Sequence, residues 1–161
     1  MHGMFNSQRN RLGNLNMLML LLVAVLLIAL TVVLHAMGTT YWIRYAVRRY
    51  GDHNGNFKPH TALPAVMWTA IVLTLLHVVE VTLWALTYIL LPGDQLDTFE
   101  KSLYFSVVSF TTLGYGDITL TDSEWRLLSG IEALDGILLV GWSTALLFIV
   151  VQRSWKHLGP E

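Results

Sequence analysis

The residue types best suited to chemistry in this chain lie in one short run, Thr111 to Asp117 (TTLGYGD). Consecutive backbone carbonyl oxygens that aim at one axis can replace the water shell of a cation. Aiming them the same way requires unusual backbone angles at alternate positions, which Gly114 and Gly116 can adopt because glycine visits positive φ freely. A run of this kind would act as a filter for cations. Thr112 adds a hydroxyl at the inner mouth of this filter, and Tyr115 can pack the filter against neighbouring aromatic rings. Since one loop supplies one quarter of a ring, the run predicts four chains around a cation pathway.

A short helix is expected directly before this run, over residues 98–110 (TFEKSLYFSVVSF). The segment is too short and too mixed to cross a bilayer, but its length suits a half-helix that enters from outside. Asp97 or Thr98 can cap its first turn, where Glu100 also places a favourable carboxylate. The partial negative charge at its C-terminal end would then stabilise a cation near the membrane centre.

Three apolar stretches are long enough to cross a bilayer, which takes about 20 residues of helix. They cover residues 15–37, 62–91 and 127–151. The composition agrees, because 54% of the 161 residues are hydrophobic and only 13% are charged, against about 25% in soluble domains. A secretory signal is the alternative for the first stretch, since Arg9 and Arg11 precede it, but its apolar run exceeds a signal core of about 7–15 residues.

The charges between these stretches predict the side of the membrane on which each connector lies. Lys and Arg accumulate on the cytoplasmic side. Residues 38–61 are basic and the connector before the third stretch is acidic, so we expect the former and the C-terminal tail (152–161) inside. Three crossings then place the N-terminal tail (1–14) outside, against a weaker opposing bias from Arg9 and Arg11.

A separate helix is predicted at the cytoplasmic interface, over residues 39–50 (TTYWIRYAVRRY). Arg44 and Arg48 lie one turn apart with aromatic residues beside them, which suits rings at headgroup depth and guanidinium groups in water. The polar, glycine-containing residues 51–58 predict a loop before the second stretch.

The filter run resembles the TVGYGD motif of potassium channels, with Leu113 in place of valine. The resemblance covers residues 62–151 and is to the small bacterial two-helix potassium channel pores. It implies an all-α membrane protein with an outer helix (62–91), a pore helix (98–110), a filter (111–117) and an inner helix (127–151). It also implies a homotetramer that conducts K⁺ passively and selectively in the plasma or inner membrane. The first stretch would be an additional helix outside that pattern.

The same resemblance assigns roles to individual residues. Asp117 would lie at the outer mouth, where it can hydrogen-bond behind the filter, with Thr111 also supporting the filter. Val108 stands where some family members carry a glutamate, and its apolar side chain removes one hydrogen bond there. The K⁺ ions would be coordinated by Thr112 and by the carbonyls of Leu113, Gly114, Tyr115 and Gly116.

The third stretch contains two glycines, Gly136 and Gly141. The resemblance implies that the inner helix can bend at such a glycine during gating. The alternative is that glycine permits close helix packing in lipid. Ser143 and Thr144 can face a water-filled cavity, or they can bond carbonyls of their own helix.

Four ionisable residues within the second and third stretches predict a polar network inside the membrane, because such groups are costly there unless paired or wet. They are His77, Glu80, Glu132 and Asp135. Glu80 and His77 lie one turn apart. They can form a proton-sensitive pair that biases gating, or Glu80 can anchor the pore helix or a neighbouring helix. Two ligands are too few for a zinc site. One or both of Glu132 and Asp135 can pack behind the filter and bond the pore helix or Asp117, or Asp135 can face the cavity. His35 is expected at the interface with no special role.

Several function classes receive no support from the sequence. The net charge of −1 gives no reason to expect nucleic acid, and no nucleophile–base arrangement suggests an enzyme. No cofactor, and no small-molecule substrate, is expected other than the permeant K⁺; the expected partners are the lipid bilayer and copies of the same chain. No stretch carries the repeated arginines of a voltage sensor. The alternatives to a potassium channel are a non-selective cation channel and a non-conducting membrane scaffold subunit.

Overall fold

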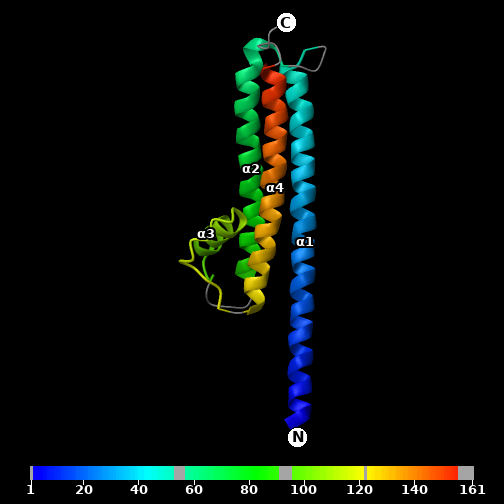
Figure 1. Cartoon of the computed structure of the whole chain (residues 1–161), viewed down its shortest axis with the longest axis vertical. Helices are drawn as coiled ribbons and strands as arrows, with labels where there is room; N and C mark the ends of the chain where they lie inside the picture. The colour runs from blue at the N-terminus through cyan, green and yellow to red at the C-terminus, as the bar shows by residue number, and fades with distance from the viewer. Residues whose placement is uncertain (1, 53–56, 91–95, 122, 156–161) are drawn as a thin grey trace. The chain divides into compact units, whose positions relative to one another are not determined.

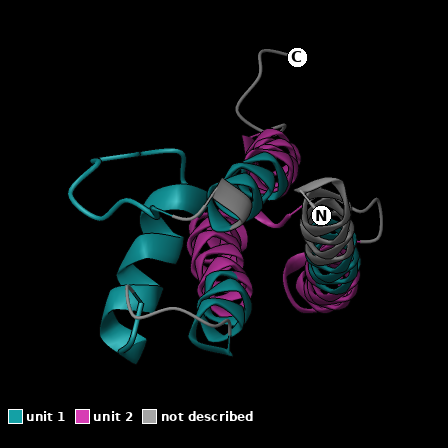
Figure 2. Cartoon of the chain, turned by 90° about the horizontal axis from the view of Figure 1, so that it is seen from below, with its two compact units in different colours: residues 1–30, 81–136 teal, residues 31–80, 137–161 magenta. Residues whose placement is uncertain are grey.

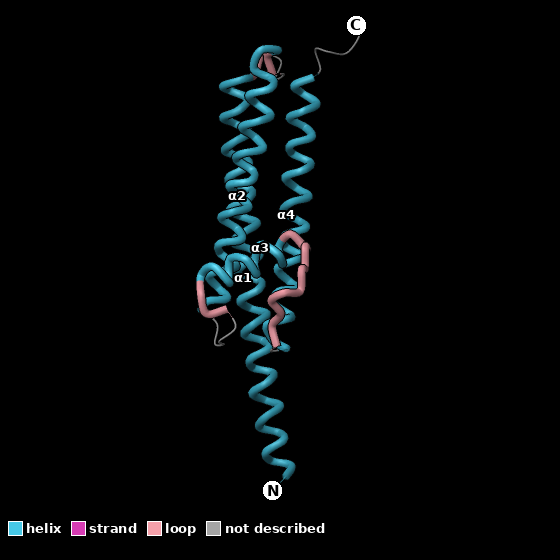
Figure 3. Tube along the Cα trace, turned by 90° about the vertical axis from the view of Figure 1, so that its left-hand side faces the viewer, coloured by secondary structure: helices cyan, strands magenta, loops and turns pink. Residues whose placement is uncertain are grey.

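The computed structural model describes residues 2–52, 57–90, 96–121 and 123–155, without the side chains of 2–16, 59, 123 and 124. Within these ranges the elements are α1 (His2–Tyr50), the short 3-10 helix η1 (Pro59–Thr61), α2 (Ala62–Leu90), α3 (Phe99–Phe110) and α4 (Ser123–Trp155) (Figure 1). The described residues form no β-strand, only an isolated bridge between Gly51 and Phe57 (Figure 3). The prediction of an all-α chain is therefore confirmed.

Three of the helices are long and apolar enough to cross a membrane. The candidate spans are Met17–Tyr50, Ala62–Leu90 and Trp125–Trp155. At a rise of about 1.5 Å per residue, even the shortest exceeds a hydrocarbon core of about 30 Å. α3 has 12 residues and cannot cross by itself. The chain is thus a multi-pass membrane protein with one short helix between its second and third spans.

The first helix differs from the sequence prediction. A tail over residues 1–14, a span over 15–37 and a separate interfacial helix over 39–50 were expected, but α1 runs without a break from His2 to Tyr50. The segment contains no proline to stop it. The Thr39 hydroxyl donates to the His35 carbonyl at 2.6 Å, so this threonine is accommodated inside the helix. The prediction of a separate interfacial helix is therefore wrong.

α4 is also longer than the predicted 127–151, since it begins at Ser123 and ends at Trp155. Arg153 lies in its last turn, where a cation suits the C-terminal end of a helix. Part of the predicted tail is consequently helical, and its remaining residues, 156–161, lie outside the described residues. The predicted outer helix ends one residue beyond α2, and that last residue, Leu91, is likewise not described.

The chain divides into two compact units, to which all three long helices contribute (Figure 2). Unit 1 comprises residues 1–30 and 81–136, and therefore contains α3 and the filter run. Unit 2 comprises residues 31–80 and 137–161.

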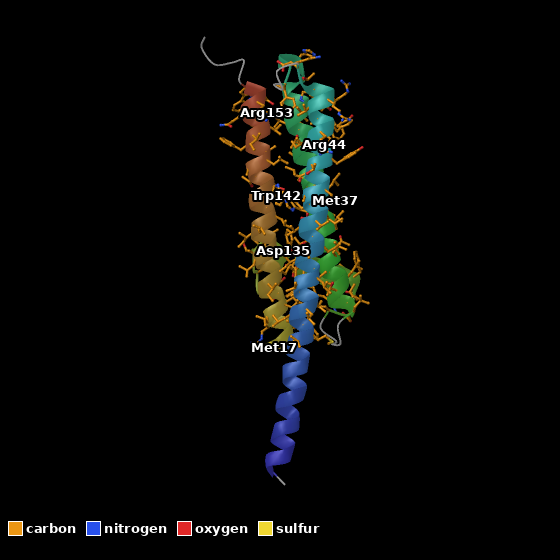
Figure 4. All side chains as sticks on the ribbon, turned by 90° about the vertical axis from the view of Figure 1, so that its right-hand side faces the viewer. Met17, Met37, Arg44, Asp135, Trp142 and Arg153 are labelled. Carbon is orange, nitrogen blue, oxygen red and sulfur yellow. The ribbon has the colours of Figure 1, made fainter. Side chains whose placement is uncertain are left out.

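Unit 2 contains an apolar core of Trp42, Ala46, Phe57, Ala65 and Val150. The Trp42 indole N–H within it donates to the Thr69 hydroxyl at 2.9 Å, which joins α1 to α2. These contacts bring segments of α1, α2 and α4 together although they are far apart in the sequence. Figure 4 labels Arg44 on α1 and Arg153 on α4, and both arginines are exposed.

Candidate functional site

α3 begins with a side-chain cap. Thr98 has extended backbone angles, and its hydroxyl oxygen accepts a hydrogen bond from the Lys101 amide at 3.3 Å. Asp97 instead forms an ion pair with the Lys101 ammonium group at 2.7 Å. Of the two caps that the sequence left open, Thr98 is the one used, and Glu100 lies in the first turn as expected.

Buried hydroxyl groups fasten α3 within unit 1. The Ser102 hydroxyl donates to the Leu96 carbonyl at 3.1 Å. The Ser106 hydroxyl lies 3.0 Å from the Val81 carbonyl of α2 and also contacts the Glu132 carboxyl group of α4. Because both serines are fully buried, these bonds leave little freedom for the helix to shift against its neighbours.

The loop after α3 folds back onto the end of that helix (Figure 3). The Thr112 amide donates to the Ser109 carbonyl at 2.9 Å. The Val108 carbonyl accepts from the amides of Leu113 at 2.9 Å and Gly114 at 3.3 Å. The Val108 side chain is buried and apolar, so its polar contribution to the loop comes from its backbone oxygen.

The backbone of the loop alternates in hand. φ is +57° at Thr112, +55° at Gly114 and +75° at Gly116. Glycine adopts such angles without cost, but for a β-branched threonine a positive φ is a genuine outlier. Thr112 is the one non-glycine residue with positive φ in the described part of the chain. Strain of this kind, held in place by surrounding hydrogen bonds, is typical of functional sites.

All residues from Thr111 to Asp117 are exposed in the single chain. Tyr115 is 66% exposed and Leu113 is 53% exposed in the single chain. A hollow of about 240 Å³ lies beside the loop and is lined by residues that include Ser109, Gly114 and Arg126. The chain by itself therefore leaves both the loop and the space beside it uncovered.

Asp117 is held by α3. The Tyr104 hydroxyl donates to its carboxylate at 2.6 Å. This hydrogen bond lowers the pKa of Asp117 below its ordinary value and raises the pKa of Tyr104. The sequence predicted that Asp117 would bond behind the filter, but it did not identify Tyr104 as the partner. A tyrosine 13 residues before an aspartate carries no recognisable spacing signal.

Glu132 and Asp135 are buried behind α3 in unit 1. The Tyr88 hydroxyl donates to Glu132 at 2.8 Å, and the Trp84 indole N–H donates to Asp135 at 3.0 Å. Of the positions that the sequence left open, packing against the pore helix is the one occupied by Glu132, through Ser106. Asp135, labelled in Figure 4, is only 2% exposed. The aromatic partners on α2 were not foreseen.

The two glycines of α4 differ in their surroundings. A Cβ atom at Gly136 would collide with the carbonyl group of Phe110, the last residue of α3, so glycine lets the two backbones approach each other. No heavy atom lies within 4 Å of the corresponding position at Gly141. Close packing therefore accounts for Gly136, while bending at either glycine stays a prediction. Thr144 bonds the Val140 carbonyl of its own helix at 2.9 Å.

In unit 2, Glu80 joins two histidines. The Nδ1 atoms of His77 and His35 lie 2.8 Å from its two carboxylate oxygens. The expected pairing of His77 with Glu80 is present, but the expectation that His35 would have no special role is wrong. His35 is fully buried and comes from α1. A lone histidine within a long apolar run was the signal for it. Glu80 and His77 thus belong to unit 2, and Glu132 and Asp135 to unit 1; a single network of all four stays a prediction.

Residues 75–153 match the sequence model of a family described as "Ion channel". The chain is 30% identical over 103 residues to the two-pore potassium channel 4 of Arabidopsis thaliana, covering 61% of this chain and 34% of the relative. It is 45% identical over 42 residues to the TWiK family of potassium channels protein 18 of Caenorhabditis elegans, covering 26% of this chain and 9% of the relative. No solved structure gives a significant match.

The chain thus spans about a third or less of the length of these relatives. The family match begins within α2 and ends within α4, so it includes α3 and the alternating loop but not α1. The segment from α2 to α4 therefore matches an ion-channel family model and is similar in sequence to parts of potassium channels.

Proposed function

We propose that the chain is the pore-forming subunit of a potassium-selective channel, with four copies around one axis. Thr112 and the carbonyl oxygens of Leu113, Gly114, Tyr115 and Gly116 coordinate the permeant K⁺. The observation that carries this proposal is the positive φ at every second residue, Thr112, Gly114 and Gly116.

The alternation has a direct electrostatic consequence. In a regular strand successive carbonyls point to opposite sides, whereas a change of hand at each second residue turns them toward the same side. Four such loops around an axis form stacked oxygen rings, which replace the water shell of a cation. The C-terminal end of α3 directs partial negative charge toward the same region.

The exposure of the single chain supports a tetrameric assembly. Leu113 and Tyr115 are exposed in the single chain, so they are available to pack against neighbouring copies. The names of both relatives describe potassium channels, which favours K⁺ over other cations as the permeant ion.

The proposed orientation places α3 and the filter loop on the outer face of the plasma or inner membrane. The exposed Arg44, Arg48 and Arg49 near the end of α1 favour a cytoplasmic position for that end. Three crossings then place the N-terminus outside and the C-terminus inside. No cofactor other than the permeant K⁺ forms part of this proposal.

Flux into liposomes tests the proposal. Purified protein is reconstituted into liposomes. K⁺ flux driven by a K⁺ gradient is then compared with Na⁺ flux driven by a Na⁺ gradient. Gly114→Ala forces a Cβ atom onto a residue with φ of +55°, so K⁺ flux should fall at least tenfold. Gly130→Ala is the matched control, because no atom lies within 4 Å of its added Cβ and its φ is not positive.

Each result separates the proposal from its alternatives. K⁺ flux well above Na⁺ flux, lost in Gly114→Ala and retained in Gly130→Ala, supports a selective filter. Equal K⁺ and Na⁺ fluxes would contradict K⁺ selectivity and indicate a non-selective cation channel. Absence of flux over a range of pH and lipid composition would favour a scaffold subunit.

A further inference from the structure

We propose that His35, His77 and Glu80 form a binding site for a transition-metal dication of the Zn²⁺ type within unit 2. Their ligand atoms all lie within 4.8 Å of one another. The sequence offered only His77 and Glu80, which are too few for a zinc site, and the fold adds the third ligand from α1. The site uses no residue of the filter run, and the inference does not depend on the proposed channel function.

The donor atoms converge with little rearrangement required. Glu80 presents one carboxylate oxygen to each histidine Nδ1 at 2.8 Å, and the two imidazole rings are stacked with centroids 5.4 Å apart. Zinc binds histidine nitrogen and carboxylate oxygen at about 2.0–2.2 Å, which spaces tetrahedral donors about 3–3.5 Å apart. Small side-chain rotations therefore convert the hydrogen-bonded arrangement into a coordination shell.

The chemistry of the donors selects the class of metal. Two imidazoles and one carboxylate suit Zn²⁺, Co²⁺ or Ni²⁺, whereas Mg²⁺ and Ca²⁺ prefer oxygen ligands alone. Three protein ligands leave a fourth position for water.

The burial of Glu80 favours the binding of a dication at this point. His35 is 0% exposed and Glu80 is 1% exposed, so the carboxylate lies where an ionised group needs compensating charge. The His77 side chain retains 20% exposure, so it is the least enclosed of the three ligands.

The residues around His35 are placed like those that contact and orient the ligands of a metal site. Its Nε2 atom lies 3.3 Å from the Ser143 hydroxyl, and Trp142 of α4 (labelled in Figure 4) contacts its ring edge-on at 5.4 Å. The other ring N–H of a metal-ligating histidine usually donates to a hydrogen-bond acceptor, which fixes the ring. With Nδ1 on the metal, Nε2 would donate to Ser143. The two residues of α4 thus hold His35 in a ligating orientation.

Metal titration of the full chain in detergent, stripped with a chelator beforehand, tests the site without any flux measurement. Co²⁺ is the probe, because its visible absorption intensifies in a four-coordinate site, and Zn²⁺ should displace it. We expect one Co²⁺ per chain and at least a 100-fold weaker affinity in each of His35→Gln, His77→Gln and Glu80→Gln. Ser143→Ala should weaken binding about 10-fold, as loss of an outer partner does. His60→Gln, at an exposed histidine of η1, is the matched control and should bind as the parent does.

Binding that survives His35→Gln, or a stoichiometry that is unchanged in Glu80→Gln, would overturn the proposal. Circular dichroism identifies any variant that fails to fold. X-ray absorption of the zinc-loaded parent chain requires no variant. Two imidazoles with one further light ligand from protein would support the site, and one imidazole or none would reject it. Since flux is not measured here, failure of this proposal and failure of the channel proposal remain distinguishable.

Discussion

Buried carboxylates occur in both units, but the groups that bind them differ in kind. In unit 1, Glu132 and Asp135 are bound by a phenol, a serine hydroxyl and an indole N–H. In unit 2, Glu80 lies between two imidazoles. Phenol, hydroxyl and indole donors are poor metal ligands at neutral pH, whereas imidazole is the commonest one. The first arrangement is suited to holding α3 and its loop in one geometry, and the second to exchanging hydrogen bonds for a ligand.

The largest expected effect comes from removing the carboxylate behind α3. Glu132→Leu deprives the buried Tyr88 hydroxyl of its acceptor and leaves Ser106 with the Val81 carbonyl, so the free energy of unfolding should fall by about 2–3 kcal/mol. Glu132→Gln retains an acceptor oxygen and should cost about 1 kcal/mol. Denaturant unfolding in detergent, followed by circular dichroism, measures both.

The corresponding substitution in unit 2 removes the carboxylate of Glu80. Glu80→Leu should cost about 1–2 kcal/mol, because His77 is partly exposed and His35 retains Ser143. A loss at Glu80 that equals or exceeds the loss at Glu132 would contradict the distinction between a fixed support and an exchangeable cluster.

The two units also differ in how closely the backbone of α4 is packed at its glycines, Gly136 in unit 1 and Gly141 in unit 2. Gly136→Ala should lower the free energy of unfolding by about 1–3 kcal/mol, because its Cβ meets the rigid Phe110 carbonyl. Gly141→Ala meets no neighbouring atom and should raise stability by about 0.5–1 kcal/mol through its higher helix propensity. Thermal unfolding of the two variants side by side tests this. Equal shifts would mean that the approach of α4 to α3 is not tight.

The smallest expected effect concerns the exposed pair beside the loop. Tyr104→Phe removes the hydrogen bond that lowers the pKa of Asp117, so this pKa should rise toward an ordinary value of about 3.9. Because the pKa is lowered in the folded chain, the stabilisation is present above about pH 4 and is lost as the pH falls through the lowered pKa. Carbon-13 NMR titration of the aspartates, with Asp117→Asn to assign the signal, measures the change. A midpoint that stays unchanged or falls would show that Tyr104 does not hold the carboxylate.

The local features of α3 and the loop that follows it could be predicted from sequence because short-range interactions decide them. Thr98 caps α3 through an amide only three residues away, and the glycine spacing of residues 114 and 116 matches the alternation of φ. Apolar length likewise predicted the three spans. The continuity of α1 through residue 39 was missed, since polar and aromatic residues at the end of a span fit either an interfacial helix or an extension of the same helix.

The sequence by itself thus determined the membrane class, the order of the helices and the loop with alternating backbone hand. The tertiary structure alone decided which partners the buried groups have. Tyr88 and Glu132 are 44 residues apart, Trp84 and Asp135 are 51 apart, and His35 and Glu80 are 45 apart. No local spacing relates such pairs, because they meet through the rotation and depth of helices that pack against one another. The same packing turned His77 and Glu80, a pair that was too small to bind a metal, into a cluster with a third ligand.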